Sequence, residues 1–167
     1  SPERASRPFD RLRDGFVMGE GSATLVVESW AHAKKRKAKV YAELVGYAAT
    51  SEAYHMVIPQ EDGQEIATTM KIGLDSAGIG PDQVDYINAH ATSTTIGDAV
   101  ETKAVKSLFK NRADKIAISA TKSLIGHTLG AAGAIGAVAT TLSIHTGQIH
   151  PTANYEEPDP ACRLDGI

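Results

Sequence analysis

Two histidines and a lysine follow two short apolar runs of this sequence, and these three residues are the best suited to chemistry. His90 lies in YINAHATSTT, after the run 84–88, and Lys122 and His127 lie in AISATKSLIGHTLGAAGA, after the run 115–119. Two imidazoles can donate N–H hydrogen bonds to one oxygen atom and stabilise negative charge that develops on it. A nearby ammonium group favours the same oxyanion and keeps a neighbouring histidine neutral. The set therefore suits an enolate or a thioester carbonyl.

Alternating helical and strand patterns surround these residues. The patterns predict helices from Asp62 or Gly63 to Ser76, over 97–110 and over 131–146, and strands over 84–88 and 115–119. This order is typical of a largely parallel sheet with helices on its faces. Functional groups gather beyond the carboxyl ends of parallel strands, and the helix between the two strands has the right length for a crossover. We therefore expect the two loops to lie side by side and both histidines to reach one common oxygen site.

The remaining segments give weaker signals. Residues 15–28 and 40–47 have strand-like runs, which we expect to pair with each other, on either side of a helix over 30–37. Residues 1–14 are polar and without periodicity, so we expect an entering segment rather than part of the core. The helix over 131–146 carries almost no charge and is expected to be buried on most sides. No closing element follows that helix, which suggests a piece of a larger protein.

Composition excludes several classes of protein. Hydrophobic residues make up 42% and charged residues 22% of the 167 positions, as in ordinary globular proteins. The net charge of −3 gives no reason to expect nucleic acid, no stretch approaches the ~20 apolar residues of a membrane helix, and the first residues contain no signal peptide. The single cysteine, Cys162, excludes an internal disulfide and a cysteine-based zinc cluster. We expect a soluble, intracellular α/β or α+β domain without a metal.

Each candidate residue also has a simpler interpretation. A loop histidine is more often structural than catalytic, a single lysine is usually solvated, and the glycines from Gly126 onward more often serve helix packing than phosphate binding. The basic run 34–39 is most simply a solvated helix end. The other histidines are expected to be structural or exposed: His32, His55, His145 and His150. A metal-dependent hydrolase is a further hypothesis, although no known ligand spacing is matched. Its ligands would be His90, Asp98, Glu101 and His127.

Taken together, the motifs resemble a known family over nearly the whole chain. The matching stretches are RPFDRLRDGFVMGEG (7–21), HAKKRKAKVYAELVGY (32–47), AYHM (53–56), NAHATST (88–94), TKSLIGHTLGAAGA (121–134) and the tail from HPTAN to LD (150–165). They are similar to the C-terminal half of β-ketoacyl-acyl carrier protein synthases of the elongating type I/II, most of all synthase II. The resemblance implies an α/β, thiolase-like fold with a mixed, mainly parallel sheet. Residues 1–167 would form most of its C-terminal half, incomplete at the C-terminal end.

The resemblance also implies an activity for the complete protein. The family elongates fatty acids by decarboxylative Claisen condensation of malonyl-acyl carrier protein with an acyl chain held on a cysteine. By this resemblance His90 and His127 bind the malonyl thioester oxygen, Lys122 organises the site electrostatically, and Thr92 and Thr94 contact the phosphopantetheine arm. The implied partners are acyl carrier protein and its thioesters, with no cofactor of the protein's own and no nucleic acid or membrane. The parent would be a homodimer in the cytoplasm, or in the plastid of a plant or alga.

Several positions depart from the family pattern. Ala91 replaces the glycine of HGTST, a small change if the backbone there avoids positive φ. Gly136 stands where a glutamate usually partners the lysine, and Lys37 replaces a turn glycine. The nucleophilic cysteine and the closing GFGGTN segment are not in the chain, and Cys162 matches an ordinary cysteine of the tail. Two alternatives stay open: a non-catalytic partner subunit of the chain-length-factor type and a polyketide-type ketosynthase.

Overall fold

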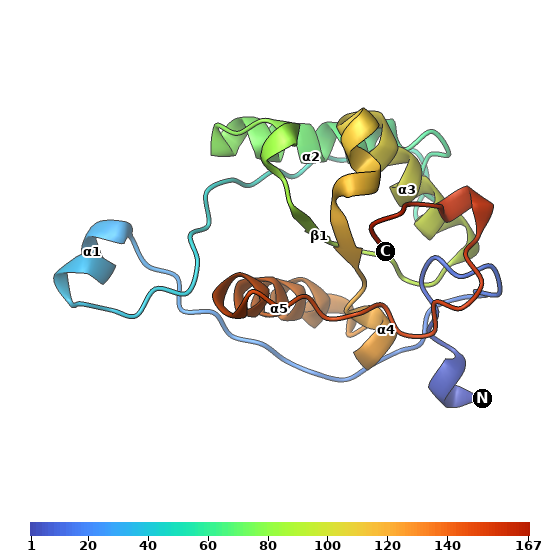
Figure 1. Ribbon diagram of the computed structural model, residues 1–167, viewed down its shortest axis with the longest axis horizontal. Helices are drawn as coiled ribbons and strands as arrows, with labels where there is room; N and C mark the ends of the chain where they lie inside the picture. The colour runs from blue at the N-terminus through green and yellow to red at the C-terminus, as the bar shows by residue number, and fades with distance from the viewer.

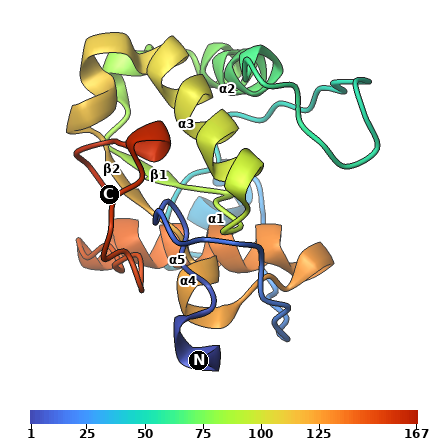
Figure 2. The ribbon, with the colours of Figure 1, turned by 90° about the vertical axis from the view of Figure 1, so that its right-hand side faces the viewer.

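The structure, a computed structural model, describes all 167 residues as an α/β body from which a long arm projects (Figure 1). The helices are α1 (Trp30–Lys35), α2 (Gln64–Ala77), α3 (Thr95–Phe109), α4 (Lys122–Ile125) and α5 (Ala132–Thr146), and the strands are β1 (Tyr86–Asn88) and β2 (Ala117–Ser119). Short 3-10 turns occupy Pro2–Arg4, Pro81–Gln83, Lys110–Lys115, Leu129–Ala131 and Pro160–Cys162. Helices α2 and α3 lie on one side of the strands and α5 on the other (Figures 1 and 2), so the body has three layers.

The two strands form the parallel pair that the sequence predicts. Their register is Tyr86 opposite Ala117, Ile87 opposite Ile118 and Asn88 opposite Ser119. Helix α3 connects them as a crossover, and α2 packs against α3 on the same face. Because parallel strands end at the same edge, the loops that follow β1 and β2 begin next to each other. This edge is where the candidate site is found.

Helix ends follow local capping signals. Thr94 accepts a hydrogen bond from the N–H of Gly97 and so begins α3, and Gly78 and Gly147 adopt left-handed conformations that end α2 and α5. Only α4 has no counterpart in the sequence prediction, which placed a loop there. This single turn carries Lys122 at its first position.

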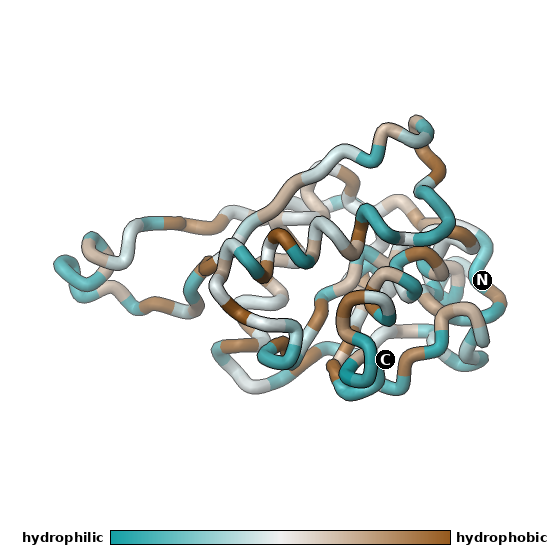
Figure 3. Tube along the Cα trace, turned by 90° about the horizontal axis from the view of Figure 1, so that it is seen from above, coloured by the Kyte–Doolittle hydropathy of each residue, from teal (hydrophilic) through white to brown (hydrophobic).

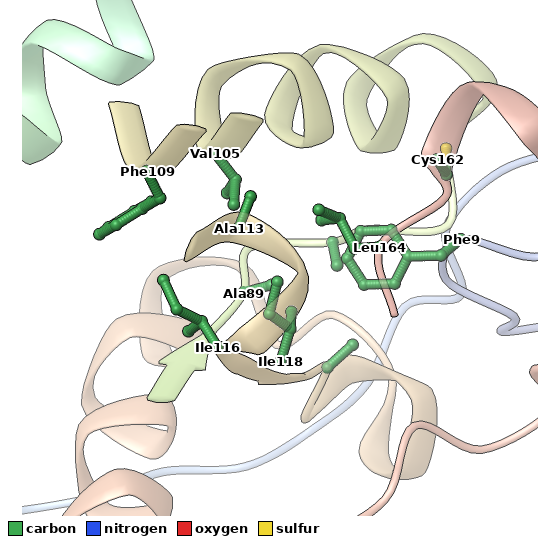
Figure 4. Close-up of a cluster of buried hydrophobic side chains, with 11 residues drawn as sticks. Phe9, Ala89, Val105, Phe109, Ala113, Ile116, Ile118, Cys162 and Leu164 are labelled. Carbon is green, nitrogen blue, oxygen red and sulfur yellow. The ribbon is translucent and has the colours of Figure 1, made fainter. Parts of the chain in front are cut away.

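The main core lies between the strands and α3 (Figure 4). Its members are Phe9, Ala89, Ala91, Val105, Phe109, Ala113, Ile116, Ile118, Ala120, Cys162 and Leu164. Phe9 is 1% exposed, and full burial of such a side chain contributes about 1.5–3 kcal/mol. The expectation that residues 1–14 lie outside the core is therefore wrong. Both ends of the chain close this core, since Cys162 and Leu164 come from the tail.

Polar residues of the first segment are buried because they bind main-chain groups. Asp10 is fully buried and accepts hydrogen bonds from the N–H groups of Leu12, Glu156 and Glu157. Arg13 is 4% exposed and donates to the carbonyl oxygens of Thr94 and Thr95. Buried polar groups are tolerated when they are hydrogen-bonded. Polar residues in a sequence usually indicate exposure to solvent. Here Asp10 instead binds the main chain of the C-terminal tail, and Arg13 binds the main chain of the loop after His90.

The arm corrects the prediction of a strand pair near the N-terminus. Residues 15–28 and 40–47 are extended, but they form no ladder with each other; the only pairing is an isolated parallel bridge between Met18 and His127. Val26 is 84% exposed and Leu44 is 80% exposed, and hydrophobic and hydrophilic stretches both occur along the arm (Figure 3). A strand forms only where neighbouring backbone supplies hydrogen-bond partners. Helix α1, predicted over 30–37, is present at the end of the arm (Figure 1).

Helix α5 is less buried than its composition predicts. Only Ser143 is buried, whereas Leu142 is 48% and Ile144 is 63% exposed. The segment Leu129–Thr146 also has the length and apolar composition of a membrane span, which corrects the expectation that no stretch approaches one. Core helices of larger proteins meet the same criterion, so length and composition alone assign no membrane here. The helix lacks covering residues on its outer face.

Candidate active site

His90 and His127 face each other at the common edge of the two strands. Their ring centroids are 5.6 Å apart and their planes are almost perpendicular, at 88°. Both line an open cleft of about 410 Å³, together with Lys122 and residues of α5. The other lining residues are Asn88, Ala89, Leu129, Ala132, Gly133, Gly136, Ala137 and Thr140. The structure thus brings together the two histidines and the lysine, as the strand-end argument predicts.

Charged side chains hold the main chain of His90. The Glu101 carboxylate accepts the N–H of His90 at 2.8 Å and the N–H of Ala91 at 2.7 Å, one with each oxygen. The ammonium of Lys122 donates to the carbonyl oxygen of His90 at 2.6 Å. Hydrogen bonds to ionised groups are stronger than those between neutral groups. Lys122 therefore acts on His90 through its backbone as well as through its charge.

The loop after His90 contains unusual backbone conformations. Ala91 has φ of 27° and Ser93 has φ of 69°, both in the left-handed region. Alanine in place of glycine at position 91 would be a small change only if the backbone there avoided positive φ. The backbone of Ala91 does not meet this condition. Asp98, one helical turn before Glu101, accepts hydrogen bonds from the N–H groups of Ser93 at 3.1 Å and Phe9 at 2.9 Å. Two carboxylates of α3 thus fix this loop.

His127 is held by backbone contacts instead. Its N–H donates to the carbonyl oxygen of Val17 at 2.7 Å, and its own carbonyl oxygen accepts from the N–H of Gly19 at 3.0 Å. Gly126 has φ of +73°, and a Cβ built there would lie 2.9 Å from the Val17 oxygen. The Phe16 ring contacts the imidazole edge, with centroids 5.4 Å apart. Glycine at 126 is therefore required both by conformation and by the close approach of the arm.

Hydrogen bonding fixes the tautomer of His127. The N–H of Leu129 donates to Nδ1 at 3.2 Å, so Nδ1 is an acceptor. In a neutral imidazole the proton must then be on Nε2. No side chain accepts from this nitrogen, which leaves an N–H donor available to a ligand in the cleft.

Burial and the nearby ammonium keep both histidines neutral. Removal from water lowers the pKa of His90 below 6.5, and the charge of Lys122 lowers it further. The pKa of His127 is lowered by the same two causes, with a further contribution from His90. Burial lowers the pKa of Lys122, while Glu101 and Asp98 act in the opposite direction. At neutral pH each ring therefore carries one N–H and no charge, so it can donate to a developing oxyanion.

The two carboxylates of α3, Asp98 and Glu101, accept hydrogen bonds from main-chain N–H groups and are not arranged around an ion. Burial raises the pKa of Asp98 to about 6 and also raises the pKa of Glu101. The structure contains no group of three histidine, cysteine, aspartate or glutamate side chains placed to hold a metal ion. Sequence reasoning considered Asp98 and Glu101 only as metal ligands and missed their contacts with the loop. The signal available in the sequence was their spacing of three residues directly after that loop, which places both carboxylates on one face of the helix.

Thr92 and Thr94 occupy a different place from the histidines. The Thr94 hydroxyl caps α3, and the Thr92 hydroxyl lies 3.1 Å from it. Neither residue lines the cleft, and their contact with a phosphopantetheine arm stays a prediction. Cys162 is fully buried, and burial raises the pKa of its thiol to about 11. Such a thiol is almost entirely protonated at neutral pH, in keeping with the prediction that it is chemically ordinary.

His150 has more partners than the sequence suggests. Its Nε2 lies 3.0 Å from the Thr121 hydroxyl and 3.4 Å from both the Ser119 hydroxyl and the Asn88 amide nitrogen. These contacts make His150 a structural residue, one of the two roles expected for it from the sequence. This polar cluster packs behind the cleft, where Asn88 lines the wall opposite Gly136.

Comparison with known proteins identifies the family. A family profile described as "Beta-ketoacyl synthase, C-terminal domain" matches residues 41–156. A protein named 3-oxoacyl-(acyl-carrier-protein) synthase 2 from Coxiella burnetii is 51% identical over 166 residues, which cover 99% of this chain and 40% of that protein. A mitochondrial 3-oxoacyl-(acyl-carrier-protein) synthase of Arabidopsis thaliana is 51% identical over 162 residues, covering 96% of this chain and 35% of that protein.

Solved structures agree with this assignment. A ketosynthase structure described as a type II PKS acyl-carrier protein in complex with its ketosynthase matches with a TM-score of 0.97 and 45% identity, over 99% of this chain and 40% of that chain. A beta-ketoacyl synthase from Burkholderia phymatum matches with a TM-score of 0.90 and 43% identity, over 96% of this chain and 38% of that chain. The predicted α/β, thiolase-like fold is confirmed. The chain spans about two fifths of the length of these relatives, and it belongs to the β-ketoacyl synthase family, of which it contains the C-terminal domain.

Proposed function

We propose that the protein containing this chain is a 3-oxoacyl-acyl carrier protein synthase, an acyltransferase that elongates fatty acids. It condenses a malonyl thioester on acyl carrier protein with an acyl thioester held on a cysteine that this chain does not contain. The observation that carries the proposal is the pair of neutral imidazoles, His90 and His127, 5.6 Å apart on one cleft. Relatives named for this activity, at about half identity over nearly the whole chain, support it.

The geometry suits the decarboxylation step. Loss of CO₂ from a malonyl thioester breaks the bond between the carboxylate carbon and the α-carbon and leaves its electron pair as an enolate. The negative charge of the enolate develops on the thioester oxygen. Nε2–H of His127 and an N–H of His90 would donate to that oxygen, while Lys122 adds positive charge nearby. The enolate carbon then attacks the acyl thioester, forming the new carbon–carbon bond and releasing the cysteine thiolate.

The partners belong to the same proposal. Acyl carrier protein delivers the substrate, and its phosphopantetheine arm, contacted by Thr92 and Thr94, makes a further cofactor unnecessary. A homodimer is proposed for the complete synthase. Some of the similar proteins are bacterial, and others are named for mitochondria or chloroplasts. The proposed location of the synthase is therefore the bacterial cytoplasm or an organelle of bacterial origin.

The test is malonyl decarboxylation by the complete synthase with each histidine replaced by alanine. Loss of one oxyanion donor lowers the rate of CO₂ release from malonyl-acyl carrier protein by about 10²-fold or more. Acylation of the synthase's cysteine, followed by intact mass, should change much less. His145→Ala is a matched control, because His145 contacts Tyr41 on the arm and lies outside the cleft. Rates near wild type in both His90→Ala and His127→Ala would remove the proposal.

A polyketide-type ketosynthase is the second candidate. The observation that favours it is the TM-score of 0.97 with a type II PKS ketosynthase that is described as bound to a hexaketide. Both candidates use the same decarboxylation, so the histidine variants do not separate them. Incubation of the synthase with acyl- and malonyl-acyl carrier protein, without a reductase, separates them by product mass. One condensation per chain supports fatty acid elongation, and several successive ketide additions support the polyketide function.

A further inference from the structure

Lys122 is a buried cation without an ion pair. Its side chain is 9% exposed, yet its ammonium group forms no salt bridge and donates only to a carbonyl oxygen. Glu101 and Asp98 attract it as more distant charges, while their own oxygens accept main-chain N–H groups. A buried charge is costly unless it is paired, so the positive charge at this position favours the binding of an anion.

The ammonium group has hydrogen-bond donors to spare. It carries three N–H donors, and the structure uses one of them, in the bond to the carbonyl oxygen of His90. Lys122 lines the cleft, and so does His127, whose Nε2–H has no acceptor in the structure. Donors from two side chains, one of them charged, therefore border the same open space. A carboxylate accepts several hydrogen bonds of this kind, and those from a charged donor are the strongest.

The wall of the cleft opposite Lys122 supplies no negative charge. The residues of α5 that line it are Ala132, Gly133, Gly136, Ala137 and Thr140, and no aspartate or glutamate lines the cleft anywhere. The first turn of α5 contains no acidic residue, so the partial positive charge of the helix N-terminus adds to that of the ammonium. Gly136 lies across from Asn88, and a Cβ built there would be 3.4 Å from Asn88 Oδ1. The missing side chain at position 136 therefore leaves both space and positive charge in the cleft.

We propose that the cleft binds a small free carboxylate, which the ammonium group of Lys122 and Nε2–H of His127 hold together. Binding of the ion does not rest on the proposed function, whereas its effect on the reaction does. Nε2–H of His127 is also the donor proposed for the thioester oxygen, so a bound carboxylate must compete with a malonyl thioester.

Titration of the complete synthase with sodium acetate tests the site directly, with the imidazole signals of His90 and His127 followed by NMR at constant ionic strength. We expect a saturable shift of the His127 signals with acetate and none with acetamide, which has nearly the same shape but no charge. Lys122→Met should weaken acetate binding about tenfold or more, because it removes the charged donor and keeps the aliphatic chain.

Lys106→Met is the matched control for the loss of one positive charge. Lys106 lies on α3, is exposed, and its side chain makes no hydrogen bond or salt bridge. Its replacement should change the affinity for acetate less than about twofold, because a distant exposed charge is screened by salt. The absence of a saturable shift in wild type, or the same affinity in Lys122→Met as in wild type, overturns the proposal.

Two substitutions at Gly136 separate charge from space and keep Lys122, so they decide the proposal even if Lys122→Met does not fold. Gly136→Glu brings a carboxylate into the cleft, where the ammonium attracts it, and should lower the affinity for acetate about tenfold. Gly136→Gln fills nearly the same volume without charge and should lower the affinity less than about threefold. Equal losses in the two variants overturn the proposal.

Kinetics of malonyl decarboxylation distinguish this proposal from the proposed function. We expect acetate to raise KM for malonyl-acyl carrier protein in wild type without changing kcat, and to have no such effect in Gly136→Glu. A synthase that binds acetate but does not decarboxylate the malonyl thioester removes the proposed function and supports the anion site. Acetate that binds without raising KM overturns the shared use of His127. A raised KM in Gly136→Glu without acetate assigns the site to the malonyl carboxylate and overturns its assignment to a free ion.

Discussion

The two histidines of the cleft are held by different kinds of contact. His90 follows β1, and charged side chains of α3 and α4 fix its backbone, with Asp98 fixing the residues that come after it. His127 follows α4, and its backbone pairs with the first part of the arm at Val17 and Gly19. The first arrangement depends on buried charge, and the second depends on the absence of side chains at two glycines.

Because of this difference, we expect the His90 loop and the His127 loop to be sensitive to different changes. The His90 loop is built on the core, so it should respond to pH and to loss of a carboxylate. The His127 loop lies against an arm without strand partners in this chain, so it should respond to steric changes at the contact. Substitutions on either side of the site test this division.

Asp98 should make the stability of the His90 side depend on pH. Burial raises its pKa from 3.8 to about 6. Between these values the folded state keeps a proton that the unfolded chain releases, so stability falls as pH rises. Relative to Asp98→Asn, which does not titrate, the free energy of unfolding of wild type should fall by on the order of 3 kcal/mol from about pH 3 to about pH 7. Urea unfolding across this range measures it, and a pH-independent difference between the two proteins would contradict it.

Gly126→Ala should disrupt the His127 side through sterics. The new Cβ would meet the Val17 oxygen at 2.9 Å and the Gly19 Cα at 3.1 Å, in a backbone conformation with φ of +73°. We expect a loss of about 2 kcal/mol in stability, measured by urea unfolding. Gly130→Ala is the control, because nothing lies within 4 Å of its Cβ position and its φ is not positive. Equal stabilities of the two variants would show that the arm does not constrain His127.

Thr94→Ala should weaken the start of α3, the helix that carries both carboxylates. The Thr94 hydroxyl accepts the N–H of Gly97 at 3.2 Å. Loss of such a cap costs about 1 kcal/mol, and Thr95→Ala, at an exposed neighbour, should cost less. Thermal unfolding checks this effect. A rise in KM for the carrier-protein substrate without a change in stability would instead show that Thr94 serves the phosphopantetheine arm alone.

Phe16→Ala should have the smallest effect and should act on one histidine only. The Phe16 ring contacts the imidazole of His127, and burial is the main cause of the lowered pKa of His127. Removing the ring admits water, so the pKa of His127 should rise towards 6.5 while that of His90 stays the same. NMR titration of the two imidazoles measures both values, and Phe16→Leu, which keeps apolar bulk, should shift the pKa less. Parallel shifts in both histidines would contradict separate support for the two loops.

Elements with local signals were predicted closely from the sequence. Helix α2 falls within two residues of its predicted bounds because left-handed glycines flank it, and β1 and β2 pair as their apolar runs and connecting helix require. The neighbouring positions of His90 and His127 followed from the same argument. The pairing of residues 15–28 with 40–47 was predicted wrongly, because an apolar, strand-like run indicates a segment suited to a strand but not the presence of a partner strand.

The sequence by itself determined the order of the elements, the edge at which the chemistry gathers and the identity of the two histidines and the lysine. Only the tertiary structure decided that Glu101 and Asp98 hold the His90 loop, that Ala91 is left-handed, and that Asp10 and Arg13 are buried. The physical reason is that a charged side chain looks the same in sequence whether it is solvated or satisfies a distant main-chain group. Hydrogen-bond partners dozens of residues away, such as the Thr94 carbonyl for Arg13, exist only after the chain has folded.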